Sequence, residues 1–249
     1  MGLYDDVVDI PRRTMVLFFV VDCSGSMKGE KIGTVNNAIR EVIPELKDIS
    51  EGNSDALIKI ATLQFSSGAK WNVDEPVPAE NYRWQDLDAE GVTDLGEACR
   101  KLNDKLSRKA FMGDATGSYA PAIFLLSDGG PNDDYKKGLG KLKENNWFKK
   151  AIKVAIAIGE DADTDVLAEF TGNIESVITV HTPEALKKWI RFVSVRASEI
   201  GSKSSSVGSQ NESNVEGERA EEEVKQKEFT DAIVQNKEEV EDDEFDDFG

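Results

Sequence analysis

Cysteine and histidine are scarce in this sequence of 249 residues. There are two cysteines, Cys23 and Cys99, and a single histidine, His181. Two cysteines supply no disulfide framework, and we expect both to be buried core residues. One histidine leaves little material for a catalytic mechanism that depends on histidine.

Long apolar stretches and targeting signals are also missing. The apolar run at residues 15–21 is too short to cross a membrane, which takes about 20 residues. The start of the chain lacks the basic residues and long apolar stretch of a signal peptide. A myristoylation signal would carry Ser or Thr where this chain has Asp6. We therefore expect a cytoplasmic protein that makes no membrane contact.

Positive charge is in short supply. The chain has 30 basic and 48 acidic residues, a net charge of −18. Residues 201–249 hold 5 of the basic and 16 of the acidic residues, so most of the excess lies there. Such a chain is a poor match for a phosphate backbone, and we expect no nucleic-acid partner. It is better suited to cations and basic surfaces.

Apolar runs alternate with amphipathic segments through the first 200 residues. The predicted strands are residues 15–21, 56–65, 122–126, 152–158 and 176–180, with a short edge strand at 71–74. The predicted helices are residues 32–46, 95–106, 135–145, 165–170 and 183–198, and Pro44 should weaken or kink the first of them. This alternation predicts an α/β fold with a doubly wound, Rossmann-like, mostly parallel sheet flanked by helices, occupying residues 1–200.

Three loops at the predicted strand ends carry oxygen ligands. They are Asp22-Cys-Ser-Gly-Ser26, Gly91-Val-Thr-Asp-Leu-Gly96 and Ser127-Asp-Gly-Gly130. Ligands of such sheets bind outside the carboxyl ends of the strands, so we expect these loops to meet there and to face solvent. Hard cations such as Mg²⁺ prefer oxygen ligands. The predicted metal ligands are Asp22, Ser24, Ser26, Thr93 and Asp128.

These residues resemble the metal-ion-dependent adhesion site (MIDAS) of the von Willebrand factor A (VWA) family. The family pattern is Asp-x-Ser-x-Ser, then Thr, then Asp, and the five residues match it in order. The resemblance covers about residues 10–200. It implies a bound Mg²⁺, Mn²⁺ or Ca²⁺ ion, and a protein partner that presents an acidic residue to the metal.

Within that family the sequence is similar to the TerY-like group of small bacterial proteins linked to tellurium resistance. The residues that carry this likeness are Asp22-Cys-Ser-Gly-Ser-Met27, Gly91-Val-Thr-Asp-Leu-Gly-Glu-Ala98 and Leu125-Leu-Ser-Asp-Gly-Gly-Pro131. The likeness implies a regulatory or scaffold role in a bacterial stress-response or defence system. Cys23 departs from the usual Thr or Val.

Plainer interpretations of the same residues stay open. The Asp22 loop could be a helix cap with turn residues, Thr93 could cap a helix, and Asp128 could belong to an ordinary turn. Enzyme motifs are poorly represented: there is no second Asp for an aspartyl-phosphate mechanism, no phosphate-binding loop with its Lys, and no Gly-x-Ser-x-Gly elbow. We expect no enzyme, and the alternative is a metal-dependent hydrolase or phosphatase acting on a phosphorylated partner.

Residues 201–249 form an expected flexible acidic tail. Its first part is rich in serine and glycine, and residues 216–240 could form a weak helix with too little apolar surface to fold alone. The segment Glu241-Asp-Asp-Glu-Phe-Asp-Asp-Phe-Gly249 combines six acids with two phenylalanines. We expect either a solvated end or a short recognition peptide, which could also serve as a carboxylate ligand for the metal of its own domain.

Overall fold

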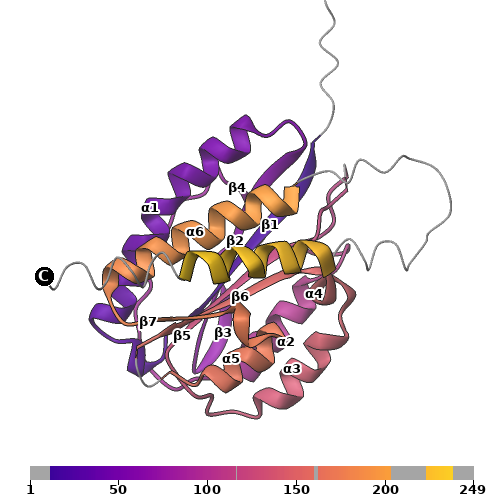
Figure 1. Ribbon diagram of the computed structural model, residues 1–249. Helices are drawn as coiled ribbons and strands as arrows, with labels where there is room; N and C mark the ends of the chain where they lie inside the picture. The colour runs from indigo at the N-terminus through magenta and orange to yellow at the C-terminus, as the bar shows by residue number, and fades with distance from the viewer. Residues whose placement is uncertain (1–11, 116, 160–161, 203–222, 238–249) are drawn as a thin grey trace, which may run out of the picture.

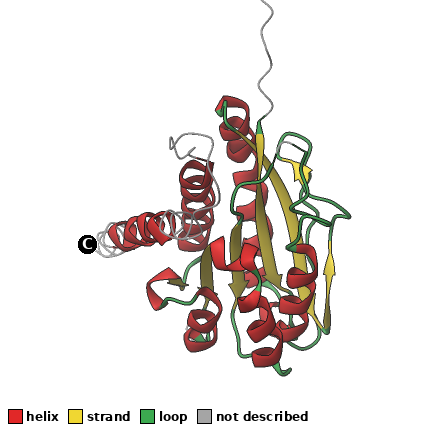
Figure 2. Ribbon diagram, turned by 90° about the vertical axis from the view of Figure 1, so that its right-hand side faces the viewer, coloured by secondary structure: helices red, strands yellow, loops and turns green. Residues whose placement is uncertain are grey.

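A central sheet with helices on both sides organises the molecule (Figures 1 and 2). The computed structural model describes residues 12–115, 117–159, 162–202 and 223–237. The strands are β1 (Arg13–Asp22), β2 (Ala56–Ser66), β3 (Gly68–Trp71), β4 (Val77–Pro78), β5 (Ala122–Ser127), β6 (Ile152–Ile158) and β7 (Val177–Val180). Their order is β3-β2-β1-β5-β6-β7, with β4 beside β2. All neighbouring pairs are parallel except those that β3 and β4 make with β2.

The helices connect these strands in the order expected of a doubly wound sheet. They are α1 (Glu30–Gly52), α2 (Leu95–Lys105), α3 (Tyr135–Glu144), α4 (Asn146–Lys150), α5 (Thr164–Thr171) and α6 (Pro183–Ser202). Two short 3₁₀ turns lie at Gly25–Met27 and Ile174–Ser176. The α/β fold predicted from the sequence is confirmed. The edge strand β3 lies earlier in the chain than predicted. Strand β4 and helix α4 are too short to leave a periodic pattern in the sequence.

Strand β1 lies at the centre and is buried on both faces. Met15 and Leu17 belong to the core beneath α1 and α6, whereas Val16 and Phe18 belong to the core beneath α2, α3 and α5. This explains why the strand is a continuous apolar run, because both of its faces are covered by helices. Helix α1 continues through Pro44, which is exposed to solvent. Backbone groups freed by a proline on that side can bond to water.

A further helix at residues 223–237 packs on the α6 side of the sheet (Figure 1). Phe229 and Ile233, one turn apart, have no solvent exposure and join the core beneath α1 and α6. The Gln226 side-chain oxygen accepts a hydrogen bond from the Lys153 N–H at 3.0 Å, and Lys237 Nζ donates to the Val177 carbonyl at 2.8 Å. The helix lies within residues 216–240, where the sequence indicated a possible weak helix, and it packs on the domain. The segment Glu241–Gly249 lies outside the described residues.

No helix in the described ranges is long and apolar enough to cross a membrane.

Candidate metal site

The carboxyl ends of β1 and β5 carry the two acidic residues of the candidate site. The strands are parallel neighbours, so Asp22 and Asp128 leave the sheet at the same edge. Asp22 is fully buried, and its two oxygens accept hydrogen bonds from the Ser24 backbone N–H at 2.8 Å and the Ser127 hydroxyl at 2.6 Å. Asp22 therefore orients the loop that carries Ser24 from the buried side of that loop.

The electrostatic setting of Asp22 favours a nearby cation. Burial raises the pKa of Asp22, and the charge of Asp128 adds to that rise, whereas the hydrogen bonds from Ser127 and Ser24 lower it. Asp128 is also buried, with 2% exposure. Gly25 and Ser26 of the first loop are exposed, as expected of a loop that faces solvent, but the two carboxylates are buried beneath it. Two buried carboxylates at one sheet edge are stabilised by positive charge from a residue or an ion.

Three side-chain oxygens form a continuous chain in front of Asp22. Ser24 Oγ lies 3.0 Å from Ser26 Oγ, and Ser26 Oγ donates to Asp128 Oδ1 at 2.8 Å. Mg²⁺ binds octahedral oxygen ligands at about 2.0–2.1 Å, so adjacent ligands lie about 3 Å from one another. The two consecutive spacings, 3.0 and 2.8 Å, match that value, and the chemistry of these oxygens fits a hard cation.

Glycine allows the first two loops to approach closely. The Gly25 N–H donates to the Gly91 carbonyl at 3.0 Å, and a Cβ on Gly25 would lie 3.3 Å from the same oxygen. Gly91 has a φ of +83°, and a Cβ there would lie 2.5 Å from the Ser67 hydroxyl oxygen. A side chain at Gly91 would therefore be strained and would push the Thr93 loop away from the serines.

Asn132 joins the Thr93 loop to the Asp128 loop. The Asn132 side-chain oxygen accepts from the Thr93 N–H at 2.9 Å, and the Thr93 carbonyl accepts from the Asn132 N–H at 2.8 Å. Thr93 is 6% exposed. The backbone of Thr93 is thus fixed relative to Asp128 by a reciprocal pair of hydrogen bonds.

Asp133 holds the start of α2, the helix that follows the Thr93 loop. Its carboxylate accepts from the N–H groups of Gly96 and Glu97 at 2.9 and 3.0 Å. A carboxylate at a helix N-terminus satisfies unpaired donors and interacts favourably with the helix dipole. Asp133 therefore positions α2, and with it the loop that carries Thr93.

Lys31, in the first turn of α1, brings a positive charge to the site. Its ammonium lies 2.6 Å from Asp128 Oδ2, and the lysine and aspartate side chains are 29% and 1% exposed. Asp128 thus has one oxygen on Ser26 and the other on Lys31.

The structure brings the five predicted residues to one edge, four by side-chain hydrogen bonds and Thr93 by its backbone. Their role as metal ligands stays a prediction.

Sequence reasoning missed the supporting residues Ser127, Lys31, Asn132 and Asp133. Ser127 ends β5, and Asn132 and Asp133 lie in the loop after it, so these three could have been found as polar neighbours of Asp128 in the sequence, whereas Lys31 gave no such signal. Within the described residues no group of three or more His, Cys, Asp or Glu could hold a metal ion.

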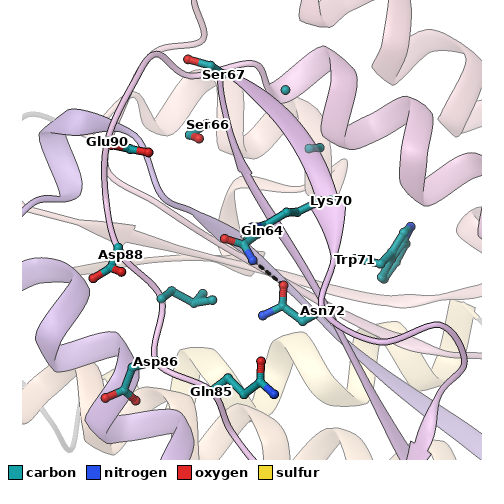
Figure 3. A pocket seen from close by; sticks show the side chains of 13 residues that line it. Gln64, Ser66, Ser67, Lys70, Trp71, Asn72, Gln85, Asp86, Asp88 and Glu90 are labelled. Carbon is teal, nitrogen blue, oxygen red and sulfur yellow. Dashed lines mark hydrogen bonds between the residues drawn. The ribbon is translucent and has the colours of Figure 1, made fainter.

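A polar cavity of about 680 Å³ lies beside these loops (Figure 3). One wall is the β2–β3 hairpin, from which Gln64, Lys70 and Asn72 project. The opposite wall is the extended segment 85–90, where Leu87 is buried and Asp88 is exposed.

The rim of the cavity is continuous with the candidate site. The Glu90 N–H donates to the Cys23 carbonyl at 2.8 Å, and the Asp94 N–H donates to the Ser66 carbonyl at 2.9 Å. These hydrogen bonds place the cavity next to the first two loops of the candidate site.

We expect both cysteine thiols to be unreactive in the folded protein. Cys23 and Cys99 are 3% and 1% exposed, and burial raises the pKa of each thiol to about 12. Since the thiolate is the reactive form, we expect no alkylation by iodoacetamide at about pH 8 and two modifications per chain after unfolding in urea. Mass spectrometry reads the outcome directly. Rapid modification of either thiol in the native protein would contradict it.

Several solved structures share this fold at low sequence identity. A von Willebrand factor type A protein from Catenulispora acidiphila is 18% identical, with a TM-score of 0.53 over 75% of this chain and 43% of its own. The pilus adhesin SpaC from Lactobacillus rhamnosus GG is 13% identical, with a TM-score of 0.60 over 76% and 31%. Proximal thread matrix protein 1 of the mussel byssus, described with a zinc-occupied MIDAS motif, is 16% identical, with a TM-score of 0.52 over 73% and 47%.

This chain thus spans less than half the length of each of those three proteins. Among curated proteins none is similar enough in sequence to match. The model of one sequence family does match, over residues 17–191, and it is that of the von Willebrand factor type A domain. That stretch begins in β1, ends in α6 and includes all five residues of the candidate site. The chain therefore belongs to the von Willebrand factor type A domain family.

Proposed function

We propose that this protein binds a divalent cation at the candidate site and uses it to hold a carboxylate of a protein partner. Ser24, Ser26, Thr93 and Asp128 would hold the ion, with Asp22 orienting the loop behind them. The observation that carries the proposal is the spacing of three oxygens at 3.0 and 2.8 Å in a chain of this family. VWA domains generally bind proteins, and one relative is described with zinc in this motif.

The ligand chemistry favours a hard cation. Hydroxyl and carboxylate oxygens suit Mg²⁺, Mn²⁺ or Ca²⁺. An ion held mostly by neutral hydroxyls keeps enough positive charge to attract an external carboxylate. Asp22, which is fully buried and accepts the Ser24 N–H, would hold Ser24 in place, while Asp128, which accepts the Ser26 hydroxyl, would supply the carboxylate ligand.

The polar cavity beside the site would receive the residues that flank the partner's carboxylate. Its walls offer amide groups from Gln64 and Asn72, an ammonium from Lys70, and carboxylates such as Asp88. Such a mixed lining suits a polar peptide rather than an apolar anchor. The acidic segment Glu241–Gly249 stays a second possible source of the carboxylate.

Metal-dependent hydrolysis of a phosphorylated partner is the alternative. One observation favours it: His181, the single histidine of the sequence, lines a cavity of about 240 Å³ that Lys31 also lines. Against it, both acidic residues of the site are buried and hydrogen-bonded. A phosphatase assay with Mg²⁺, comparing the wild type with Asp128→Asn, separates the two functions.

A role in a tellurium-resistance-like stress response or defence system belongs to the same proposal and rests on the sequence resemblance, and a cytoplasmic location rests on the sequence features described above.

The test is capture of partners from the native cell with the full chain as bait, in Mg²⁺ and in chelator. We expect a protein that is retained by the wild type in Mg²⁺, released by chelator, and not retained by Asp128→Asn. A partner retained equally under all three conditions would contradict a metal-dependent interaction.

A further inference from the structure

The ion pair between Lys31 and Asp128 places a positive charge on a proposed metal ligand. The ammonium lies 2.6 Å from Asp128 Oδ2, whose side chain is almost completely buried. Lys31 itself is 29% exposed, at the point where α1 begins. The contact is therefore short, it joins a partly exposed ammonium to a buried carboxylate, and solvent screens it only in part.

A divalent ion bound to Asp128 would lie only a few ångströms from this ammonium. Two like charges at that distance repel each other even when solvent screens them. The ammonium also supplies part of the charge compensation that the buried carboxylates need. Metal binding must therefore either displace Lys31 from Asp128 or proceed against its charge.

We infer that Lys31 is a tethered cation that competes with the metal for Asp128 and thereby sets the metal concentration at which the site fills. The inference rests on the proposed function, because it concerns the same site. With Lys31 paired to Asp128, the site is compensated at low metal concentration. When the metal binds, the ammonium moves away from Asp128 and the site becomes competent for an external carboxylate.

The surroundings of Lys31 give the displaced side chain a place to go. A cavity of about 240 Å³ lies on that side of α1, lined by Lys31, Glu30 and His181 and by the first turn of α6 at Pro183. An ammonium released from Asp128 can enter this space without leaving the protein surface, and the Glu30 carboxylate on its wall is a potential counter-charge.

The experiment is calorimetric titration of the full-length protein with Mn²⁺ at low salt, for the wild type, Lys31→Met and Lys31→Arg. Lys31→Met removes the charge and keeps most of the aliphatic stem, so its Mn²⁺ dissociation constant should fall by about tenfold or more. Lys31→Arg keeps the charge and should stay close to the wild type. The difference between wild type and Lys31→Met should shrink in high salt, because Lys31 is partly exposed.

Lys28→Met is the matched control. Lys28 is exposed and precedes α1 by two residues, so this change alters the net charge equally without touching Asp128. It should leave Mn²⁺ affinity nearly unchanged. Lys31→Gln serves as a second neutral variant in case Lys31→Met does not fold.

Equal Mn²⁺ affinity in the wild type and in both neutral variants, or weaker binding in the neutral variants, would overturn the inference while leaving the proposed function intact. Absence of Mn²⁺ binding in the wild type and in the neutral variants alike would overturn the proposed function and the inference together. Tighter binding in Lys28→Met as well would show a general charge effect and would also overturn the role assigned to Lys31.

Discussion

Replacing Asp128 with Asn should abolish the stabilisation that Mg²⁺ or Mn²⁺ gives to the folded protein. An ion that binds only the native state raises the free energy of unfolding by about 2.7 kcal/mol at 100 times its dissociation constant. Asp128 supplies the negative charge at the end of the oxygen chain and accepts from Ser26 at 2.8 Å. Asn keeps the shape of the buried side chain and leaves no cavity. A lost metal effect therefore cannot be confused with a packing defect.

Thermal denaturation with and without Mg²⁺ measures this effect. Asp134→Asn is the matched control, because Asp134 lies in the same loop, is exposed, and caps α3 without a side-chain hydrogen bond. It should keep the full Mg²⁺ shift. If the wild type and Asp128→Asn show equal shifts on adding Mg²⁺, Asp128 is not a metal ligand.

Ala is the wrong substitution at these positions, for a reason that only the structure reveals. The sequence places Asp22 and Asp128 after buried strands, and loops at strand ends usually face solvent. Here the loops fold back over both carboxylates, and Asp22 accepts hydrogen bonds from Ser127 and Ser24. Removing that carboxylate leaves buried donors unpaired, which costs about 1–3 kcal/mol each. Asp22→Ala would therefore confuse lost metal binding with lost stability.

The arrangement of strands and the order of the site residues were predictable from the sequence because both follow from local rules. The run at residues 15–21 is apolar at every position, which only a strand covered on both faces requires. Parallel strands then bring their carboxyl ends to one edge, so the loops after β1 and β5 were expected at the same edge, and the structure shows that the two strands are neighbours. The position of Thr93 was predictable for the same reason, because α2 starts at that edge and Thr93 lies just before it.

The contacts of Lys31 and of the helix at residues 223–237 could not be predicted in this way. Lys31 reaches Asp128 only because of the angle at which α1 leaves the first loop, and no periodicity encodes that angle. The helix at 223–237 has just two fully buried apolar residues, Phe229 and Ile233, too few to indicate folding on their own. Its helical state depends on docking to the domain rather than on propensity, which is the usual source of stability for short helices.

The largest expected loss of stability comes from adding one methyl group at Gly138. Helix α3 crosses α2 at this residue, and a Cβ on Gly138 would lie 2.3 Å from the Gly96 carbonyl oxygen and 3.0 Å from its Cα. Both of those atoms belong to the backbone, so no side-chain rotation can relieve the overlap. The helices must separate, which in a well-packed core costs about 1–3 kcal/mol or more, and we expect Gly138→Ala to reach the upper end of that range.

The same substitution should weaken the metal effect, because Gly96 also serves the site. Asp133 accepts the Gly96 N–H at 2.9 Å at the start of α2, just after the Thr93 loop. Moving α2 away from α3 therefore breaks the contact that positions Thr93.

Gly140→Ala is the control: Gly140 lies one half-turn along the same helix, is exposed, and has no atom within 4 Å of an added Cβ. That change should be neutral or stabilise the helix by up to about 1 kcal/mol. Urea denaturation of both variants, with and without Mg²⁺, measures the two effects, and similar stabilities for Gly138→Ala and Gly140→Ala would show that the close crossing of α2 and α3 is not required.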